Sequence, residues 1–208
     1  MNILSQSDKN ELTKVFESDS IIWYGLDFSE FKLTNPLKLT HGPIIKYKYM
    51  KEWLKTHNSQ TFNGQSLRTF MMKRLNKDKL LFVRSFSKLT IDSIDENNIV
   101  MNTSHTITQE RVSEIIKSYK SYYEDGIGFV ILVESFNKLT EHVSLLYIFF
   151  DTKNKEIISL KRVSSGASGA GMTNHWANGM IRCTKKYFYD YITPEYKKYK
   201  AEKRKSRS

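Results

Sequence analysis

Three apolar segments follow one another closely and decide the fold: Ile127-Gly-Phe-Val-Ile-Leu-Val-Glu-Ser-Phe136, His142-Val-Ser-Leu-Leu-Tyr-Ile-Phe-Phe-Asp151 and Glu156-Ile-Ile-Ser-Leu-Lys-Arg-Val163. Each has the length and the β-branched and aromatic content of a strand. The links between them, 137–141 and 152–155, are too short for a parallel crossover. The spacing therefore predicts an antiparallel three-stranded meander.

Two further strands are expected before the meander. Residues 20–28 are apolar on both faces, which is typical of a strand covered above and below. Residues 80–86 have a weaker strand pattern, and residues 92–103 are polar enough for a loop. We therefore expect an α/β (α+β) fold with one mixed, largely antiparallel sheet of about five strands and helices packed on it.

Helical spacing of apolar residues predicts five helices, over residues 8–18, 44–54, 66–75, 108–125 and 174–191. Thr106 or Thr108 is expected to cap the fourth helix and Asn174 the fifth, with Pro194 ending the last one. The chain is thus expected to close with the meander followed by a helix.

The 208 residues suit one domain, which we expect over 1–194, followed by a flexible basic tail over 195–208. Cys183 is the single cysteine, which excludes an internal disulfide framework. The sequence has neither a signal peptide at its beginning nor an apolar run long enough to span a bilayer. We expect a soluble, cytoplasmic protein, or a periplasmic one if a leader has been removed.

The Gly-rich segment Gly166-Ala-Ser-Gly169-Ala-Gly171 lies between a strand and a helix, where backbone N–H groups can hold a phosphate. Its spacing matches neither the dinucleotide fingerprint nor the P-loop. Close packing of backbone against backbone is therefore favoured, and anion binding by Gly166, Gly169, Gly171 and Asn174 is kept as the alternative.

Other chemistries have little support in the residue pattern. The five histidines are scattered without metal-ligand spacing, so we expect no metal and no cofactor. Cys183 falls within a helix and is expected to be a buried, inert thiol. Asp27 and Glu134 lie in apolar strands, where each could be an acid with a perturbed pKa in a functional site. The favoured alternative is an ordinary carboxylate at a strand end, either in water or paired with a neighbour such as Arg84.

Charge is the remaining signal, since 33 Lys and Arg against 22 Asp and Glu give a net +11, of which residues 195–208 contribute +5. These cations, interleaved with two tyrosines, are candidates for contacts with nucleic acid or an anionic surface. The alternative is an idle, solvated tail, which like-charge termini often are. The candidate residues are Lys197, Lys198, Lys200, Lys203, Arg204, Lys205 and Arg207.

Three segments together carry a resemblance: Trp23-Tyr-Gly-Leu-Asp-Phe-Ser29, Gly126-Ile-Gly-Phe-Val-Ile-Leu-Val-Glu-Ser-Phe-Asn-Lys138, and residues 160–179 with Asn174-His-Trp-Ala177. From about residue 20 to 192 the sequence resembles a family of uncharacterised α/β proteins common in Bacteroidetes. That family is similar in fold to the N-terminal domain of the Tol-Pal β-propeller protein and to the periplasmic domain of the curli-export channel. The resemblance implies an α/β fold and often export, and it supplies no catalytic residue.

The function expected from the sequence is non-enzymatic: an interaction or accessory module that binds a protein partner. A nucleic-acid-associated protein acting through phosphate contacts is the main alternative. An enzyme with a phosphate-bearing substrate at Gly166–Asn174 is a weaker one.

Overall fold

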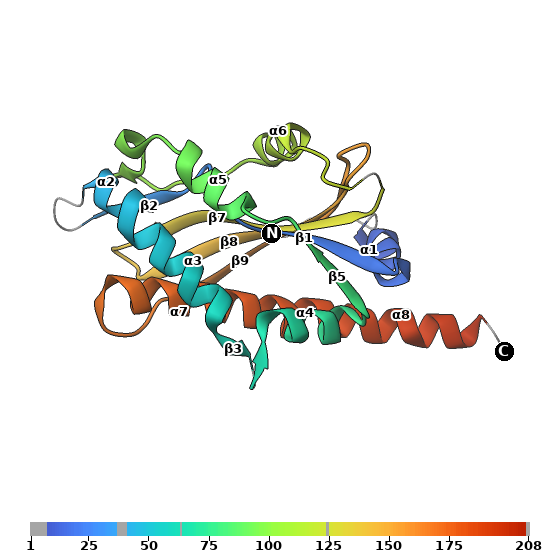
Figure 1. Ribbon diagram of the computed structural model, residues 1–208. Coiled ribbons are helices and arrows are strands. Elements are labelled where there is room, and N and C mark those ends of the chain that lie inside the picture. The colour runs from blue at the N-terminus through green and yellow to red at the C-terminus, as the bar shows by residue number, and fades with distance from the viewer. Residues whose placement is uncertain (1–7, 37–40, 63, 124, 207–208) are drawn as a thin grey trace.

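The computed structural model is a mixed α/β structure in which helices cover both faces of one sheet (Figure 1). It describes residues 8–36, 41–62, 64–123 and 125–206, without the side chains of 8–11 and 61. The strands are β1 (Ser20–Asp27), β2 (Lys32–Thr34), β3 (Thr61–Phe62), β4 (Gln65–Ser66), β5 (Lys79–Phe82), β6 (Val100–Met101), β7 (Ile127–Asn137), β8 (His142–Asp151) and β9 (Ile157–Gly166). The helices are α1 (Asp8–Glu17), α2 (Gly42–Ile44), η1 (Ile45–Tyr49), α3 (Met50–Ser59), α4 (Leu67–Leu75), α5 (Phe86–Ser93), η2 (Glu96–Asn98), α6 (Gln109–Ser118), α7 (Gly171–Lys186), η3 (Tyr187–Ile192) and α8 (Thr193–Lys205).

The meander is confirmed, because β7 pairs antiparallel with β8, and β8 with β9. The expectation of a largely antiparallel sheet of about five strands is wrong. The main sheet has seven strands, and four of its six pairings are parallel: β1 with β5, β1 with β7, β2 with β6 and β2 with β7. Long connections that contain helices separate these strands, and such connections are what parallel pairing requires.

Seven strands nevertheless occupy five positions across the sheet. β1 pairs with residues 127–132 of β7 and β2 with residues 135–137, while β8 pairs along the whole of β7. A strand has two edges, so β1 and β2 must lie end to end on the same edge of β7. β5 and β6 then lie end to end outside them.

Each face of the sheet has its own apolar core. On one face Phe129, Val133 and Tyr147 pack under α3, α4 and α7. On the other, Val130, Leu132 and Ile148 pack under α6 and the start of α5. Alternate residues of β7 therefore enter opposite cores, which is why this strand is apolar throughout.

The helix predictions hold in part. Thr108 caps α6 by accepting a hydrogen bond from Arg111 N–H, but this helix ends at Ser118. α5 was not expected, and the strand predicted over 80–86 stops at Phe82. Asn174 lies inside α7, whose cap position is Ala170.

The chain after residue 194 is also different from expectation. Pro194 does not end the last helix, because the π-helical turn η3 joins α7 to α8 without a break. There Thr193 Oγ1 donates a hydrogen bond of 2.7 Å to Phe188 O. Residues 195–205 are helical, and Tyr196 and Tyr199 pack on Phe16 of α1, which corrects the expected flexible tail for these residues. Arg207 lies outside the described residues.

Candidate functional site

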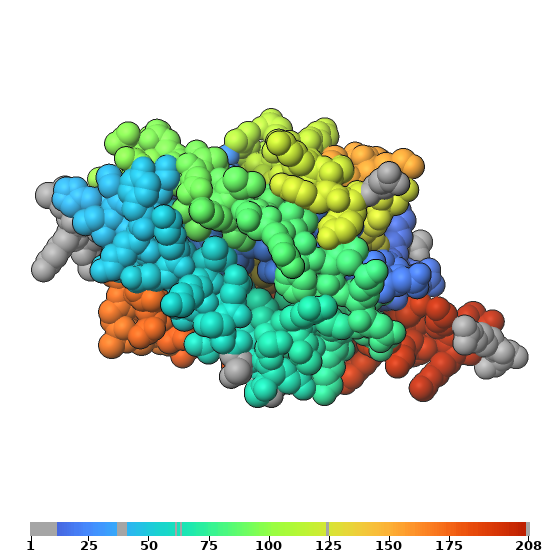
Figure 2. All heavy atoms as spheres, in the orientation of Figure 1, coloured from blue at the N-terminus to red at the C-terminus, as the bar shows by residue number. Residues whose placement is uncertain are grey.

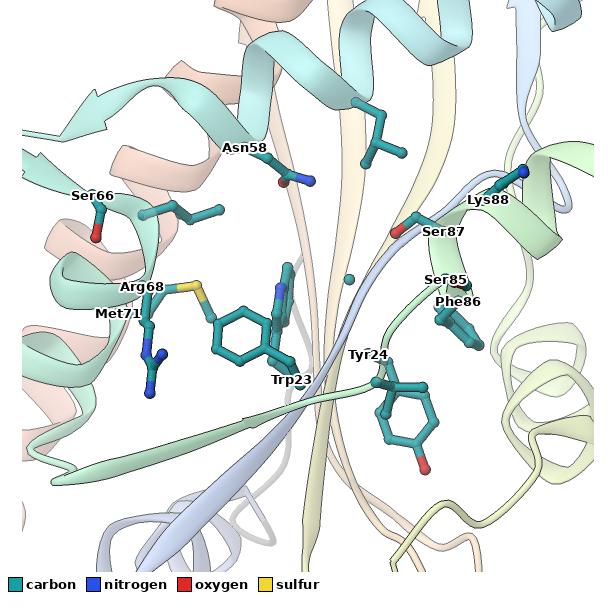
Figure 3. A pocket seen from close by; sticks show the side chains of 15 residues that line it. Trp23, Tyr24, Asn58, Ser66, Arg68, Met71, Ser85, Phe86, Ser87 and Lys88 are labelled. Carbon is teal, nitrogen blue, oxygen red and sulfur yellow. The ribbon is translucent and has the colours of Figure 1, made fainter.

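A pocket of about 350 Å³ opens at the outer edge of β1, and we call it the edge pocket (Figure 3). β5 covers that edge only as far as Phe82, which pairs with Trp23. The chain then leaves the sheet and returns as α5, whose Ser87 Oγ accepts a hydrogen bond of 2.9 Å from Leu26 N–H. The edge of β1 is uncovered between these two elements, and α3 and α4 form the opposite wall.

Gly25 allows this arrangement. Its φ of 109° is a conformation that L side chains rarely adopt, and a Cβ there would collide with Ser87 Oγ. The pairing of β1 with β7 also shifts by one residue between Trp23 and Gly25. This bulge turns the strand at the pocket, as bulges commonly do beside functional sites.

The polar groups of the edge pocket are two cations, an amide and several hydroxyls, and none of the described lining residues carries a negative charge. Arg68 and Lys88 project on opposite sides of it, and Asn58 extends toward its centre (Figure 3). No Asp or Glu is among its lining residues. Within the described ranges, neither Arg68 nor Lys88 has a salt bridge, and Trp23 Nε1 has no hydrogen-bond partner although the residue is only 5% exposed.

The positive charge of the protein is concentrated in the part of the sequence that supplies most of the residues lining this pocket. Residues 41–90 contain 11 basic and 2 acidic residues, a net +9. The basic ones outside the core include Lys48, Lys51, Lys55, Arg68, Lys73, Lys79, Arg84 and Lys88. With +5 in residues 195–208, the rest of the chain is left at −3.

From the sequence, the charge of the terminus was expected to matter, whereas the larger excess in residues 41–90 was missed. A count in windows of 50 residues would have found it. The pocket itself had no sequence signal, since it depends on where β5 leaves the sheet.

The predicted cations of α8 extend the same surface. Lys197, Lys198, Lys200, Lys203, Arg204 and Lys205 are all exposed. A second pocket, of about 400 Å³, lies between α8 and the end of α4 and is lined by Asn76, Tyr196, Lys200 and Arg204 among others. Residues 42–90 and α8 are visible on one face in Figure 2, which is hollowed near its centre where blue atoms of β1 appear. We call this surface the basic face.

The structure places Gly166, Gly169, Gly171 and Asn174 where β9 turns into α7. Gly169 has a φ of 114°, and a Cβ there would come within 2.9 Å of Asn178 Nδ2. Asn178 Nδ2 donates to Ser168 O at 3.0 Å, which ties the loop to the helix. The Glu52 carboxylate accepts a hydrogen bond from Thr173 Oγ1 in the first turn of α7, which places a negative charge where an anion would bind.

The two strand acids are buried, contrary to the expectation of contact with water. Tyr119 Oη and Ser29 N–H both donate hydrogen bonds to the Asp27 carboxylate. Burial raises the pKa of Asp27 above its ordinary value, and these hydrogen bonds offset only part of that increase. Glu134 accepts hydrogen bonds from Ile107 N–H at 2.7 Å and Ser144 Oγ at 2.6 Å.

Glu134 also forms an ion pair with Arg162, at 2.9 Å between Oε1 and the guanidinium. Pairing with a neighbour was one of the expected arrangements, with Arg84 as an example, and for Glu134 this neighbour is Arg162. The two carboxylates thus serve separate internal networks.

The described residues offer little support for a nucleophilic thiol or a metal site. Burial raises the pKa of the Cys183 thiol to about 12, so the thiol is protonated at neutral pH. Burial lowers the pKa of His57 to about 4, and this imidazole lies 3.1 Å from Thr184 Oγ1. Where residues are described, no cluster of three or more His, Cys, Asp or Glu could hold a metal ion.

Comparison with known proteins found neither a family model nor a curated protein that matches this chain. The resemblance to the Bacteroidetes family therefore stays a prediction. No helix in the described residues is long and apolar enough to cross a membrane.

Proposed function

We propose that this protein binds single-stranded nucleic acid through its basic face. The observation that carries the proposal is the distribution of charge. Eight exposed Lys and Arg side chains of residues 41–90 and the exposed cations of α8 belong to segments that are visible on the face in Figure 2, whereas the residues outside 41–90 and 195–208 sum to −3. Lys and Arg neutralise phosphates and release counterions, and this gain grows with the number of phosphates contacted. A linear polyanion can contact many of these cations at the same time.

A single strand fits the shape of this face better than a duplex. Proteins that bind single strands combine a positive groove with aromatic groups on which bases stack. The basic face has two hollows, and both have aromatic walls: Trp23 and Phe82 in the edge pocket, Tyr196 and Tyr199 beside α8. A rigid duplex would span these hollows without entering them.

We further propose binding rather than catalysis. The carboxylates most suited to acid–base chemistry, Asp27 and Glu134, are engaged in internal hydrogen bonds, and the only thiol is buried. The edge pocket is lined by cations and donors without a carboxylate to act as a base. The protein partner expected from the sequence would have to be acidic to use the same surface, and the experiment below separates the two.

The test is the affinity for a fluorescent 20-nucleotide single strand of random sequence, measured by anisotropy from 50 to 300 mM salt. We expect log K to fall linearly with log salt concentration, by about 0.7 for each phosphate neutralised. Lys55→Gln/Lys197→Gln, two exposed positions on α3 and α8, should reduce the slope by about 1.4 and weaken binding roughly 10-fold at 100 mM salt.

The matched control is Lys117→Gln/Lys120→Gln, which removes the same charge from α6 and the residues after it, on the opposite side of the sheet. This variant should bind almost as the unmodified protein does. Equal loss in both variants would show unspecific attraction by net charge. Absence of oligonucleotide binding at 50 mM salt would refute the proposal and leave an acidic protein as the partner to seek.

A further inference from the structure

We infer that the edge pocket holds one unstacked base of the bound strand, with the flanking phosphates on Arg68 and Lys88. This inference rests on the proposed function and adds a specific subsite to it. Binding of a strand through its phosphates alone needs only surface cations, whereas the edge pocket has features that surface cations do not explain.

The first feature is an aromatic-walled cavity of suitable size. At about 350 Å³ it lies within the range of small-molecule pockets. Phe82 remains 39% exposed at its wall although it is a large apolar residue. The guanidinium of Arg68 lies 5.2 Å from the centre of that ring. An exposed ring beside a guanidinium plane is a platform on which any base can stack.

The second feature is a set of donors without partners. In the described chain Trp23 Nε1 has no hydrogen-bond acceptor, and the indole borders the pocket. Unlike Trp176 Nε1, it is not one of the buried polar atoms without a partner, so it is accessible from the pocket and a ligand acceptor can take the place of water there. Asn58 Nδ2 also has no acceptor among the described residues, because Asn58 contacts His57 through its Oδ1. The ring nitrogens and carbonyl oxygens of bases are acceptors of this kind.

The third feature is the placement of the cations. Arg68 on α4 and Lys88 on α5 lie on opposite sides of the hollow (Figure 3). A base within a strand has a phosphate on each side, so a strand that inserts one base can place a phosphate near each cation. A free nucleoside monophosphate has one phosphate and would use only one of them.

The test compares three ligands on the full chain at 100 mM salt. They are a 12-nucleotide single strand, the same strand with abasic sites at every position, and adenosine monophosphate. The abasic strand keeps all phosphates, so the proposed function predicts that it binds with the same salt dependence. The inference predicts that the strand with bases binds about 10-fold more tightly, which corresponds to one stacked base.

Two variants locate the difference in the pocket. Trp23→Phe keeps an aromatic ring against Phe129 but removes the indole N–H together with the second ring of the indole. Arg68→Gln changes an exposed side chain and leaves the core untouched. Each should reduce the preference for the strand with bases by threefold or more, whereas Lys117→Gln on α6 should leave it unchanged.

The outcomes separate the two ideas. If neither strand binds, the proposed function is refuted, and the inference with it. If both strands bind equally, binding through the phosphates stands, and both the stacking of bases on the basic face and the base pocket are refuted. If adenosine monophosphate binds more tightly than the strand with bases, the pocket is a metabolite site and not a subsite for a strand.

Discussion

The two sides of the sheet's long central strand differ in how completely their polar groups are paired. On the meander side, β7, β8 and β9 cover one another along their whole length, and Glu134 has four donors to its carboxylate. On the other side, β5 leaves the edge of β1 after four residues, and cations and an indole N–H face a cavity. The first side is built for stability, and the second keeps groups available for a ligand.

The largest test of this contrast removes the carboxylate at the centre of the meander side. Glu134→Ala leaves Ile107 N–H, Ser144 and Arg162 without their acceptor. We expect the free energy of unfolding to fall by about 3 kcal/mol, measured by urea denaturation, because Ile107 N–H and the guanidinium lose a buried anion. Oligonucleotide binding at a temperature where the variant is folded should not change.

Glu156→Ala is the matched control, since this carboxylate belongs to the same meander but is exposed. Its stability should be that of the unmodified protein. If Glu134→Ala also left the free energy of unfolding unchanged, the account of the meander as the stabilising side would be wrong.

The contrast also explains what the sequence could and could not predict. The meander follows from short links and long apolar runs, which are local signals. The strands that pair with β1 and β2 are dozens of residues away in the sequence. No local pattern predicts which of them become neighbours or whether they pair in parallel. Glu134 was recognisable as unusual, but Arg162 is its partner because β7 and β9 both pair with β8. Arg68 and Lys88, 20 positions apart, line the same pocket because the chain leaves the sheet after β5.

A second test concerns the buried contact that joins α3 to the meander. His57 Nε2 lies 3.1 Å from Thr184 Oγ1, which in turn lies 3.1 Å from Tyr147 Oη on β8. Burial lowers the pKa of His57 from 6.5 to about 4. The unfolded chain therefore binds a proton more readily than the folded one between these values, and stability falls as the pH falls through that window.

Between pH 6.5 and pH 5 this group should reduce the free energy of unfolding by about 2 kcal/mol. Burial also lowers the pKa of His105, which acts in the same direction. Urea denaturation at a series of pH values should show a shallower decline for His57→Gln than for the unmodified protein. If the two plots of stability against pH were parallel, His57 would bind its proton as readily in the folded protein as in the unfolded chain.

The smallest expected effect, and the finest test of the contrast, lies within α5. Ser87 and Thr90 use their hydroxyls in the same way. Each accepts a hydrogen bond from a backbone N–H where β5 no longer covers the chain: Leu26 N–H in β1 at 2.9 Å and Phe28 N–H just after β1 at 3.1 Å. Ser87 lines the edge pocket, and its bond to Leu26 N–H is partly buried. The bond to Thr90 is buried, although Thr90 borders a neighbouring pocket of about 400 Å³. Water should therefore replace the first acceptor more readily than the second.

Ser87→Ala should therefore reduce the free energy of unfolding by about 0.5 kcal/mol and Thr90→Val by about 1.5 kcal/mol, because only the second leaves a buried N–H without an acceptor. Thermal or urea denaturation of the two variants measures the difference directly. Equal costs would mean that the edge of β1 at Leu26 is as dry as the edge at Phe28. In that case the cavity beside Gly25 would be closed in solution, and a base could not enter it.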